Sequence, residues 1–286
     1  MEGLPHLDPI TPLSPTVTRI LGHNPSKFTL QGTNTYLIGT GPTRLLLDTG
    51  EGKPEWLSSI REALETAGPD VKISDVILTH WHPDHVGGVK DVLSLPGHGD
   101  VRVWKHSPDE GQHPIPSNKV FHTPGATLTA HHTPGHTTDH MCFLLHEENA
   151  LFTGDNVLGH GTAVFEDLAA YMSSLEKMAA VEGFTGRAYP AHGDVIEDGR
   201  GKVREYISHR QQREDQILKV LEEQGGGGEL GSMEIVKVVY KDYPESLWAP
   251  AEGGVKQVLR KLEGDGRVVE GSKGSGKWRL SGKAAL

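Results

Sequence analysis

The sequence has little of the chemistry that stabilises secreted or membrane-embedded proteins. Cys142 is the single cysteine among 286 residues, so no internal disulfide can form, which fits a reducing compartment. No run of about 18 apolar residues is present, so a membrane-spanning helix is not expected. Hydrophobic residues make up 35% of the chain, an ordinary share for a soluble protein. These absences favour a globular protein that does not enter a membrane.

The N-terminal segment 1–15 lacks the patterns of a targeting sequence. It is rich in proline and acidic, without the charged start and apolar core of a secretory signal. It also lacks the arginine-rich character of a mitochondrial transit peptide. We therefore expect a cytoplasmic protein.

The most informative stretch is a dense group of polar side chains directly after the apolar run 76–78. Four potential metal ligands fall within six residues: His80, His82, Asp84 and His85. Imidazole and carboxylate together suit zinc or a similar divalent ion. A cluster of this density after a strand is hard to explain by packing alone, so we predict a metal site.

Three further candidate ligands each follow an apolar run later in the chain. They are His136 in Pro-Gly-His, Asp155 in Thr-Gly-Asp, and His192 in Pro-Ala-His-Gly. The adjacent glycines allow the backbone to turn sharply beside a ligand. Five histidines and two aspartates are too many for one tetrahedral ion and about right for two. Such a set leaves coordination positions free, which is typical of a catalytic site.

This pattern resembles the metallo-β-lactamase superfamily, in its glyoxalase II and lactamase-like hydrolase branch. The resemblance begins near Val17, includes segment 29–36 and Asp48-Thr49-Gly50, and continues to Trp278. It implies an α/β fold, a four-layer αββα sandwich with the metals at one edge. It also implies a ligand set in which His80, His82 and His136 bind one ion, Asp84, His85 and His192 bind the other, and Asp155 bridges them.

The residue pattern agrees with a layered α/β architecture. Apolar or β-branched runs predict strands, and several are continuous, as expected for strands covered on both faces. The expected strands are 35–38, 44–47, 75–78, 101–104, 141–145 and 150–152. Helical periodicity predicts helices over 54–67, which begins with a proline, and over 167–181, which begins with an acidic residue.

The chain divides into three expected regions: a flexible segment 1–16, a metallo-β-lactamase domain 17–198, and a C-terminal region 199–286. In the last region the residue pattern predicts a long helix 201–224 and a glycine-rich linker 225–228. Helices 232–240 and 252–262 and strands 267–269 and 277–280 are expected after the linker. Two helices followed by a hairpin suggest a winged-helix module. Residues 229–286 hold 10 Lys/Arg against 8 Asp/Glu, and the rest holds 18 against 30. This balance is a poor electrostatic match to nucleic acid.

The expected chemistry follows from two divalent ions, with zinc the first choice and manganese or iron compatible with the same donors. A divalent ion lowers the pKa of bound water from 15.7 to about 7, so a metal-held hydroxide would be the nucleophile. Asp84 is the expected catalytic residue, orienting the nucleophile and accepting its proton. No Ser/His/Asp or Cys/His nucleophile arrangement is present.

Two side chains are candidates to support the site. Asp48 follows an apolar run and could fix a ligand imidazole or the His80 loop, or simply form a turn. His160 could enter the substrate pocket, or be a loop histidine without a role. His140 is expected to begin a strand rather than to bind metal.

The substrate is not decided by the metal site, because related sites act on thioesters, lactams and phosphodiesters. Two groups of the superfamily share segment 31–36 and the winged tail, and the run 153–168 looks more like the first of them. One comprises fungal thioesterases that release a polyketide acyl chain from an acyl carrier domain, and the other comprises endoribonucleases that cut single-stranded RNA. We expect the thioesterase, with RNA cleavage or hydrolysis of a small acyl thioester or ester as alternatives.

Overall fold

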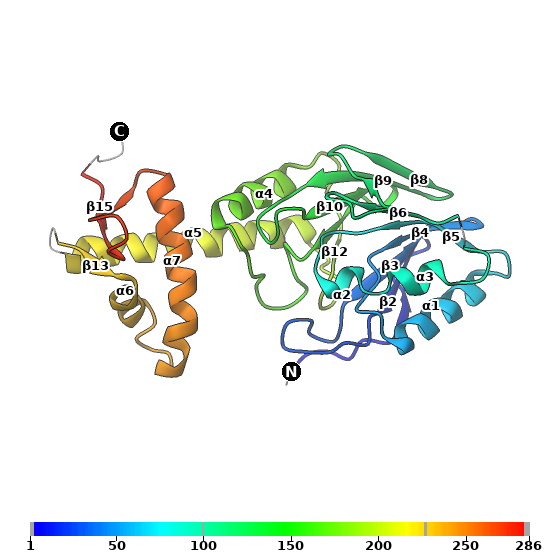
Figure 1. The fold of residues 1–286 in the computed structure, drawn as a ribbon, viewed down its shortest axis with the longest axis horizontal. Coiled ribbons are helices and arrows are strands. Elements are labelled where there is room, and N and C mark those ends of the chain that lie inside the picture. Colours follow the sequence, from blue (N-terminus) through cyan, green and yellow to red (C-terminus); the bar gives the residue numbers. More distant parts are fainter. Residues whose placement is uncertain (1–2, 99, 226–227, 283–286) are drawn as a thin grey trace. The chain divides into compact units, whose positions relative to one another are not determined.

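The computed structural model describes residues 3–98, 100–225 and 228–282. It separates into two compact units: Met1–Glu166 with Ser173–Arg204, and Asp167–Met172 with Glu205–Leu286. Figure 1 shows two sheets and their helices in the first unit, and a smaller group of helices and short strands in the second. Among the described residues, none of the helices carries an apolar stretch long enough to cross a bilayer.

The first unit contains a seven-stranded sheet in simple sequence order. Its first four strands are antiparallel, and β4 to β7 run parallel to their neighbours. The strands are β1 (Ile10–Pro12), β2 (Val17–Leu21), β3 (Asn34–Ile38), β4 (Thr43–Leu47), β5 (Lys72–Ile77), β6 (Arg102–Lys105) and β7 (His113–Pro114). Strand β1 lies inside segment 1–16 and pairs with β2, so residues 10–12 belong to the sheet.

A five-stranded sheet faces the first one. Its order is β12-β11-β10-β9-β8, antiparallel except for the parallel pair of β11 and β12. The strands are β8 (Val120–Thr123), β9 (Ala126–His132), β10 (Met141–Leu145), β11 (Ala150–Gly154) and β12 (Ala188–Pro190), with the 3-10 turn η1 (His146–Glu148) between β10 and β11.

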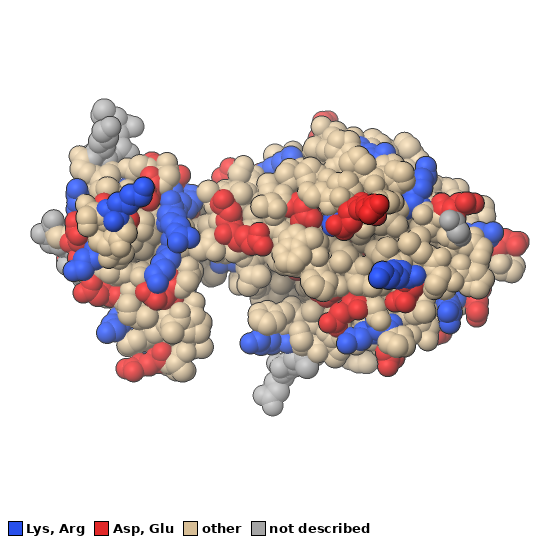
Figure 2. All heavy atoms as spheres, in the orientation of Figure 1, with Lys and Arg blue, Asp and Glu red and all other residues tan. Residues whose placement is uncertain are grey.

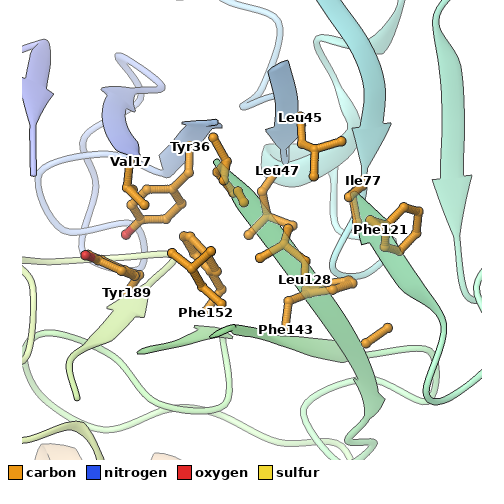
Figure 3. Packing of buried hydrophobic residues seen from close by; sticks show 14 of the residues in the cluster. Val17, Tyr36, Leu45, Leu47, Ile77, Phe121, Leu128, Phe143, Phe152 and Tyr189 are labelled. Carbon is orange, nitrogen blue, oxygen red and sulfur yellow. The ribbon is translucent and has the colours of Figure 1, made fainter. Parts of the chain in front are cut away.

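The core between the two sheets is aromatic and aliphatic. Tyr36 of β3 lies 5.0 Å, ring to ring, from Phe152 of β11, and Phe152 stacks on Tyr189 of β12 at the same distance. Figure 3 shows these rings with aliphatic side chains from both sheets pointing into the shared layer. Burial of this apolar surface holds the two sheets face to face.

Helices cover the outer faces of both sheets. A second apolar cluster joins the outside of the seven-stranded sheet to α1 (Pro54–Ala67) and α3 (Val89–Leu93), with Trp56 fully buried in it. Residues 173–180 of α4 (Leu168–Ala180) lie against the five-stranded sheet. There Lys177 donates a hydrogen bond to the carbonyl of His132, at the end of β9. The layers are therefore α, β, β, α, and the predicted α/β sandwich is confirmed.

The second unit contains a small helical module with a three-stranded sheet. It comprises most of α5 (Gly199–Gly225), then β13 (Leu230–Gly231), α6 (Ser232–Val239), η2 (Glu245–Leu247), α7 (Trp248–Gly264), β14 (Val268–Glu270) and β15 (Lys277–Leu280). Its core includes Ile235, Val258 and Trp278. The helix predicted over 252–262 begins four residues earlier in the structure, at Trp248. Pro250 is tolerated in its first turn, where a backbone N–H would have no acceptor within the helix. Part of the expected linker, residues 226–227, lies outside the described residues.

Candidate metal centre

Seven side chains predicted as ligands meet where several strands end. His80 follows β5, and His82, Asp84 and His85 lie at the short helix α2 (Pro83–Val86). The remaining three come from the other sheet, on the β9–β10 loop and directly after β11 and β12: His136, Asp155 and His192. The centre thus draws on both sheets of the first unit.

One cluster contains His80, His82, His136 and Asp155. The Nε2 atoms of His80 and His136 lie 3.2 Å apart, and each lies 2.9–3.1 Å from Nδ1 of His82. Oδ2 of Asp155 is 3.5 Å from Nε2 of His136. Three imidazole nitrogens thus converge on one point.

A second cluster contains Asp84, His85 and His192. Oδ2 of Asp84 lies 3.3 Å from Nε2 of His85 and 3.4 Å from Nε2 of His192. Asp155 faces this cluster with its other oxygen, because Oδ1 lies 3.5 Å from Nε2 of His85 and 3.2 Å from Nε2 of His192. The two carboxylate oxygens of Asp155 are therefore directed at different clusters.

Hydrogen bonds fix which imidazole nitrogen faces the centre. Nδ1 of His85 donates to Oδ2 of Asp48 at 2.8 Å, and Nδ1 of His136 donates to the Val164 carbonyl at 2.9 Å. Thr79 Oγ1 donates to Asp48 and accepts from Nδ1 of His80. In all three rings Nδ1 is held by these bonds, so Nε2 is the nitrogen that faces the cluster and would bind a metal once it is deprotonated.

Asp48 accepts hydrogen bonds from two residues in or beside the clusters. Besides His85, it accepts hydrogen bonds from the backbone N–H and the hydroxyl of Thr79, both at 2.8 Å. Its backbone is left-handed, with φ 58°, a conformation that aspartate tolerates better than most residues. The carboxylate is buried behind the ligands rather than in solvent.

Electrostatics differ across the centre. Burial lowers the pKa of His80 well below its ordinary value, and burial followed by the nearby His136 lowers the pKa of His82. Burial acts the same way on His85, yet the carboxylates of Asp48 and Asp155 outweigh it and raise the pKa of His85 well above the ordinary value.

The two carboxyl groups that face the imidazoles stay ionised. Burial acts to raise the pKa of Asp84 and of Asp155. The neighbouring imidazoles of His85 and His192 outweigh burial and lower both pKa values below the ordinary range. Two carboxylates and the neutral imidazoles of His80 and His82 are therefore available at neutral pH, which is the form in which these groups bind metal.

The residues present fit bound divalent metal. Nε2 of His85 and Oδ1 of Asp155 are buried without a hydrogen-bond partner among the described residues, an arrangement that is costly without a cation. Zinc–nitrogen bonds of about 2.0–2.1 Å in a tetrahedral site place ligand nitrogens about 3.3 Å apart. The nitrogens of the first cluster, at 2.9–3.2 Å, are close to that spacing.

A cavity of about 530 Å³ opens over the centre. Its base includes ligands of both clusters, and its walls are mostly apolar, with Phe28, Leu30, Leu158 and Val164 among them. His160 also lines this cavity and belongs to neither cluster. Phe28 and Val164 are 66% and 62% exposed, so the mouth offers apolar surface to a ligand.

Sequence reasoning missed several groups that hold the ligands. His140, expected only to begin a strand, precedes β10 and accepts the backbone N–H of Asp155 at Nε2, 3.1 Å away. A Cβ on Gly154 would lie 2.4 Å from that nitrogen, so this position needs glycine. Thr79 links His80 to Asp48. The position of Thr79 beside a candidate ligand was the one available signal.

Comparisons with known proteins agree with this geometry. Residues 28–192 match the family model of the metallo-beta-lactamase superfamily, and residues 231–278 match that of the beta-lactamase associated winged helix domain. The solved beta-lactamase domain protein from Burkholderia ambifaria has the same fold. Its TM-score is 0.74 at 16% identity, covering 95% of this chain and 93% of that one.

Two curated fungal relatives are similar over almost their whole length. Lactamase-like protein ptaB of Pestalotiopsis fici is 48% identical, covering 94% of this chain and 86% of the relative. The atrochrysone carboxyl ACP thioesterase of Aspergillus terreus is 45% identical, covering 97% of this chain and 89% of the relative. With its ligand clusters, its sandwich fold and its winged-helix module, the chain belongs to the metallo-beta-lactamase superfamily and is a metal-dependent hydrolase.

Proposed function

We propose that the protein hydrolyses an acyl thioester carried by an acyl carrier domain of a polyketide synthase, using two divalent ions. The observation that carries this proposal is the largely apolar cavity whose lining includes residues of both clusters. An acyl chain could pack against its walls while the thioester carbonyl reaches the centre. The name of the Aspergillus terreus relative, an ACP thioesterase, supports the same substrate class.

The seven ligands divide between two ions. His80, His82 and His136 would hold one ion, and Asp84, His85 and His192 the other. Asp155 would bridge them, with Oδ2 toward the first cluster and Oδ1 toward the second. Zinc is the ion expected for this donor set, and manganese or iron would fit it too. When bound, such ions polarise a carbonyl and make a bound water acidic.

The residues of the chain direct the reaction. Asp84 is ionised, since its pKa is lowered, and its side chain is 22% exposed, so the oxygen that Thr33 does not engage accepts a proton from the attacking water. The water oxygen adds to the carbonyl carbon, and the carbon–sulfur bond then breaks. The proton taken by Asp84 passes to the departing sulfur, giving a carboxylic acid and a thiol.

Charge pairing in the second unit, which contains the winged-helix module, favours a role other than nucleic-acid binding. Three of its lysines lie within 2.7–3.7 Å of carboxylates, as Lys219 does of Glu223, Lys256 of Glu252 and Lys261 of Glu214. Figure 2 shows acidic side chains interspersed with the basic ones on this unit. Paired lysines leave fewer charges for phosphates. The endoribonuclease alternative finds no support among the relatives named above, and the cytoplasmic location stays a prediction.

The test is a hydrolysis assay of the metal-loaded protein with three substrates. These are an acyl chain on a carrier protein, the same acyl group on a small thiol, and single-stranded RNA. We expect release from the carrier that is lost in Asp84→Ala, with circular dichroism unchanged and RNA intact. Turnover of the small thioester alone would indicate a general thioesterase. RNA cleavage lost in the same variant would refute the proposal.

A further inference from the structure

Segment 31–36, Gln-Gly-Thr-Asn-Thr-Tyr, has no ligand in it, yet it contacts the second cluster at two points. The hydroxyl of Thr33 donates to Oδ2 of Asp84 at 3.0 Å, and Thr33 forms a β-bridge with His192. Asn34 donates from Nδ2 to the carbonyls of Pro190 and Gly193, at 2.8 and 2.7 Å. The beginning of β3 therefore touches one ligand directly and holds the loop that carries another.

The direction of the Thr33 hydroxyl is fixed by Asn24. The backbone N–H of Thr33 donates to Oδ1 of Asn24 at 2.9 Å, so the amide group of Asn24 turns Nδ2 toward Thr33 Oγ1, 3.0 Å away. Nδ2 can only donate, so Oγ1 accepts that bond and its own proton is free for Asp84. Asn24 is 8% exposed, so water competes little for these bonds.

The surrounding backbone is shaped around Asn24. A Cβ at Gly22 would lie 2.8 Å from Oδ1 of Asn24, and one at Gly32, whose φ is +131°, would lie 3.3 Å from the same atom. Both positions therefore need glycine for the Asn24 side chain to reach Thr33. The arrangement is built by four residues that are close in sequence and a ligand far from them.

We infer that Thr33, held by Asn24, is a positioning residue that fixes the Asp84 carboxylate: its hydroxyl engages Oδ2 and sets the plane in which Asp84 would meet a metal ion. This rests on Asp84 acting as a ligand, as proposed above. Loss of the hydroxyl leaves Asp84 free to rotate and weakens the second site, while the first site, which Thr33 does not touch, keeps its ion.

The test compares Thr33→Val, which keeps the shape but removes the hydroxyl, with Thr33→Ser, which keeps the hydroxyl. Thr35→Val is the matched control, because the buried Thr35 hydroxyl, two residues further along in β3, bonds to the Ile20 carbonyl and Trp56 rather than to a candidate ligand. Each variant is titrated with cobalt(II), and metal affinity, the cobalt absorption spectrum and melting temperature are measured.

In Thr33→Val we expect the weaker of two cobalt affinities to fall about 10–100-fold, the usual effect of removing a group that orients a ligand. The absorption bands of the cobalt ion at that weaker site should also change, and Thr33→Ser should restore both the affinity and the bands. Thr35→Val should lower the melting temperature while leaving both affinities unchanged. Unchanged cobalt binding in Thr33→Val, or an equal loss in Thr35→Val, would overturn the inference. A wild-type protein that binds fewer than two ions would instead count against the proposed function.

Discussion

The two ligand clusters are built differently, although Asp155 faces both. The first is rich in imidazole, with three nitrogens within 2.9–3.2 Å of one another and burial keeping His80 and His82 neutral. The second has fewer imidazoles and more negative charge, with Asp84 in front of His85 and Asp48 behind it. The first cluster is thus prepared for a metal by neutral donors, and the second by charge.

The largest effect is expected from removing Asp155, the residue that faces both clusters. Asp155→Ala takes a carboxylate oxygen from each cluster, so both ions should be lost and hydrolysis should fall by at least about a thousandfold, as for groups that act as a unit. Metal analysis and kcat/KM on the best substrate check this. Retention of one full equivalent of metal would show that the clusters are more independent than the geometry implies.

A smaller effect should separate the clusters. Asp48→Asn keeps the shape and removes the charge behind His85, so the second-cluster affinity should fall about 10–100-fold. The first cluster should lose less, because Asp48 reaches His80 only through Thr79. Equilibrium dialysis with zinc measures the two affinities. Equal losses at both sites would argue against the division.

Acid should empty the clusters in order. The raised pKa of His85 means that a proton competes with the second ion at a pH above the ordinary histidine value, so this ion should leave first as pH falls. The lowered pKa values of His80 and His82 keep them neutral further down, so the first ion should persist. Metal content after dialysis between about pH 8 and pH 5 tests this. Simultaneous loss would contradict it.

The smallest effect concerns a histidine outside both clusters. His160→Ala should leave metal content unchanged and raise KM about two- to tenfold, the value of one hydrogen bond to substrate. Steady-state kinetics with metal analysis of the same sample measures both quantities. A loss of metal would place His160 closer to the ligands than the cavity lining indicates.

Much of the fold could be predicted because apolar runs and helical periodicity are strong in this chain. The helix Pro54–Ala67 and the strand Met141–Leu145 have the predicted bounds. The hairpin of β8 and β9 was not predicted. In β9 only Ala126, Leu128 and Ala130 alternate with polar residues, and two of these three side chains are small. Such a strand has too weak a period-two pattern to stand out.

The candidate site could be predicted in part for a similar reason. Most candidate ligands follow an apolar run, and His136 stands in a Pro-Gly-His turn, so local patterns were enough to find them. The groups that orient the ligands could not be found this way. Thr33 and Asp84 are 51 residues apart, and His140 meets the backbone of Asp155, a contact that leaves no mark in the sequence. Strand order within each sheet brings these pairs together, because Thr33 and Asp84 flank β3 and β5 of the seven-stranded sheet, and His140 and Asp155 flank the neighbouring strands β10 and β11.

The ligands also divide by sheet, since four follow β5 of the seven-stranded sheet and three follow strands of the five-stranded one. Ions held between them would cross-link two layers that are otherwise joined by apolar packing. Metal binding would then stabilise the fold as well as supply reactivity, because ions that bind only the folded chain raise its free energy of unfolding by mass action. Metal supply in the cell would consequently govern how long each molecule survives, beyond how fast it turns over.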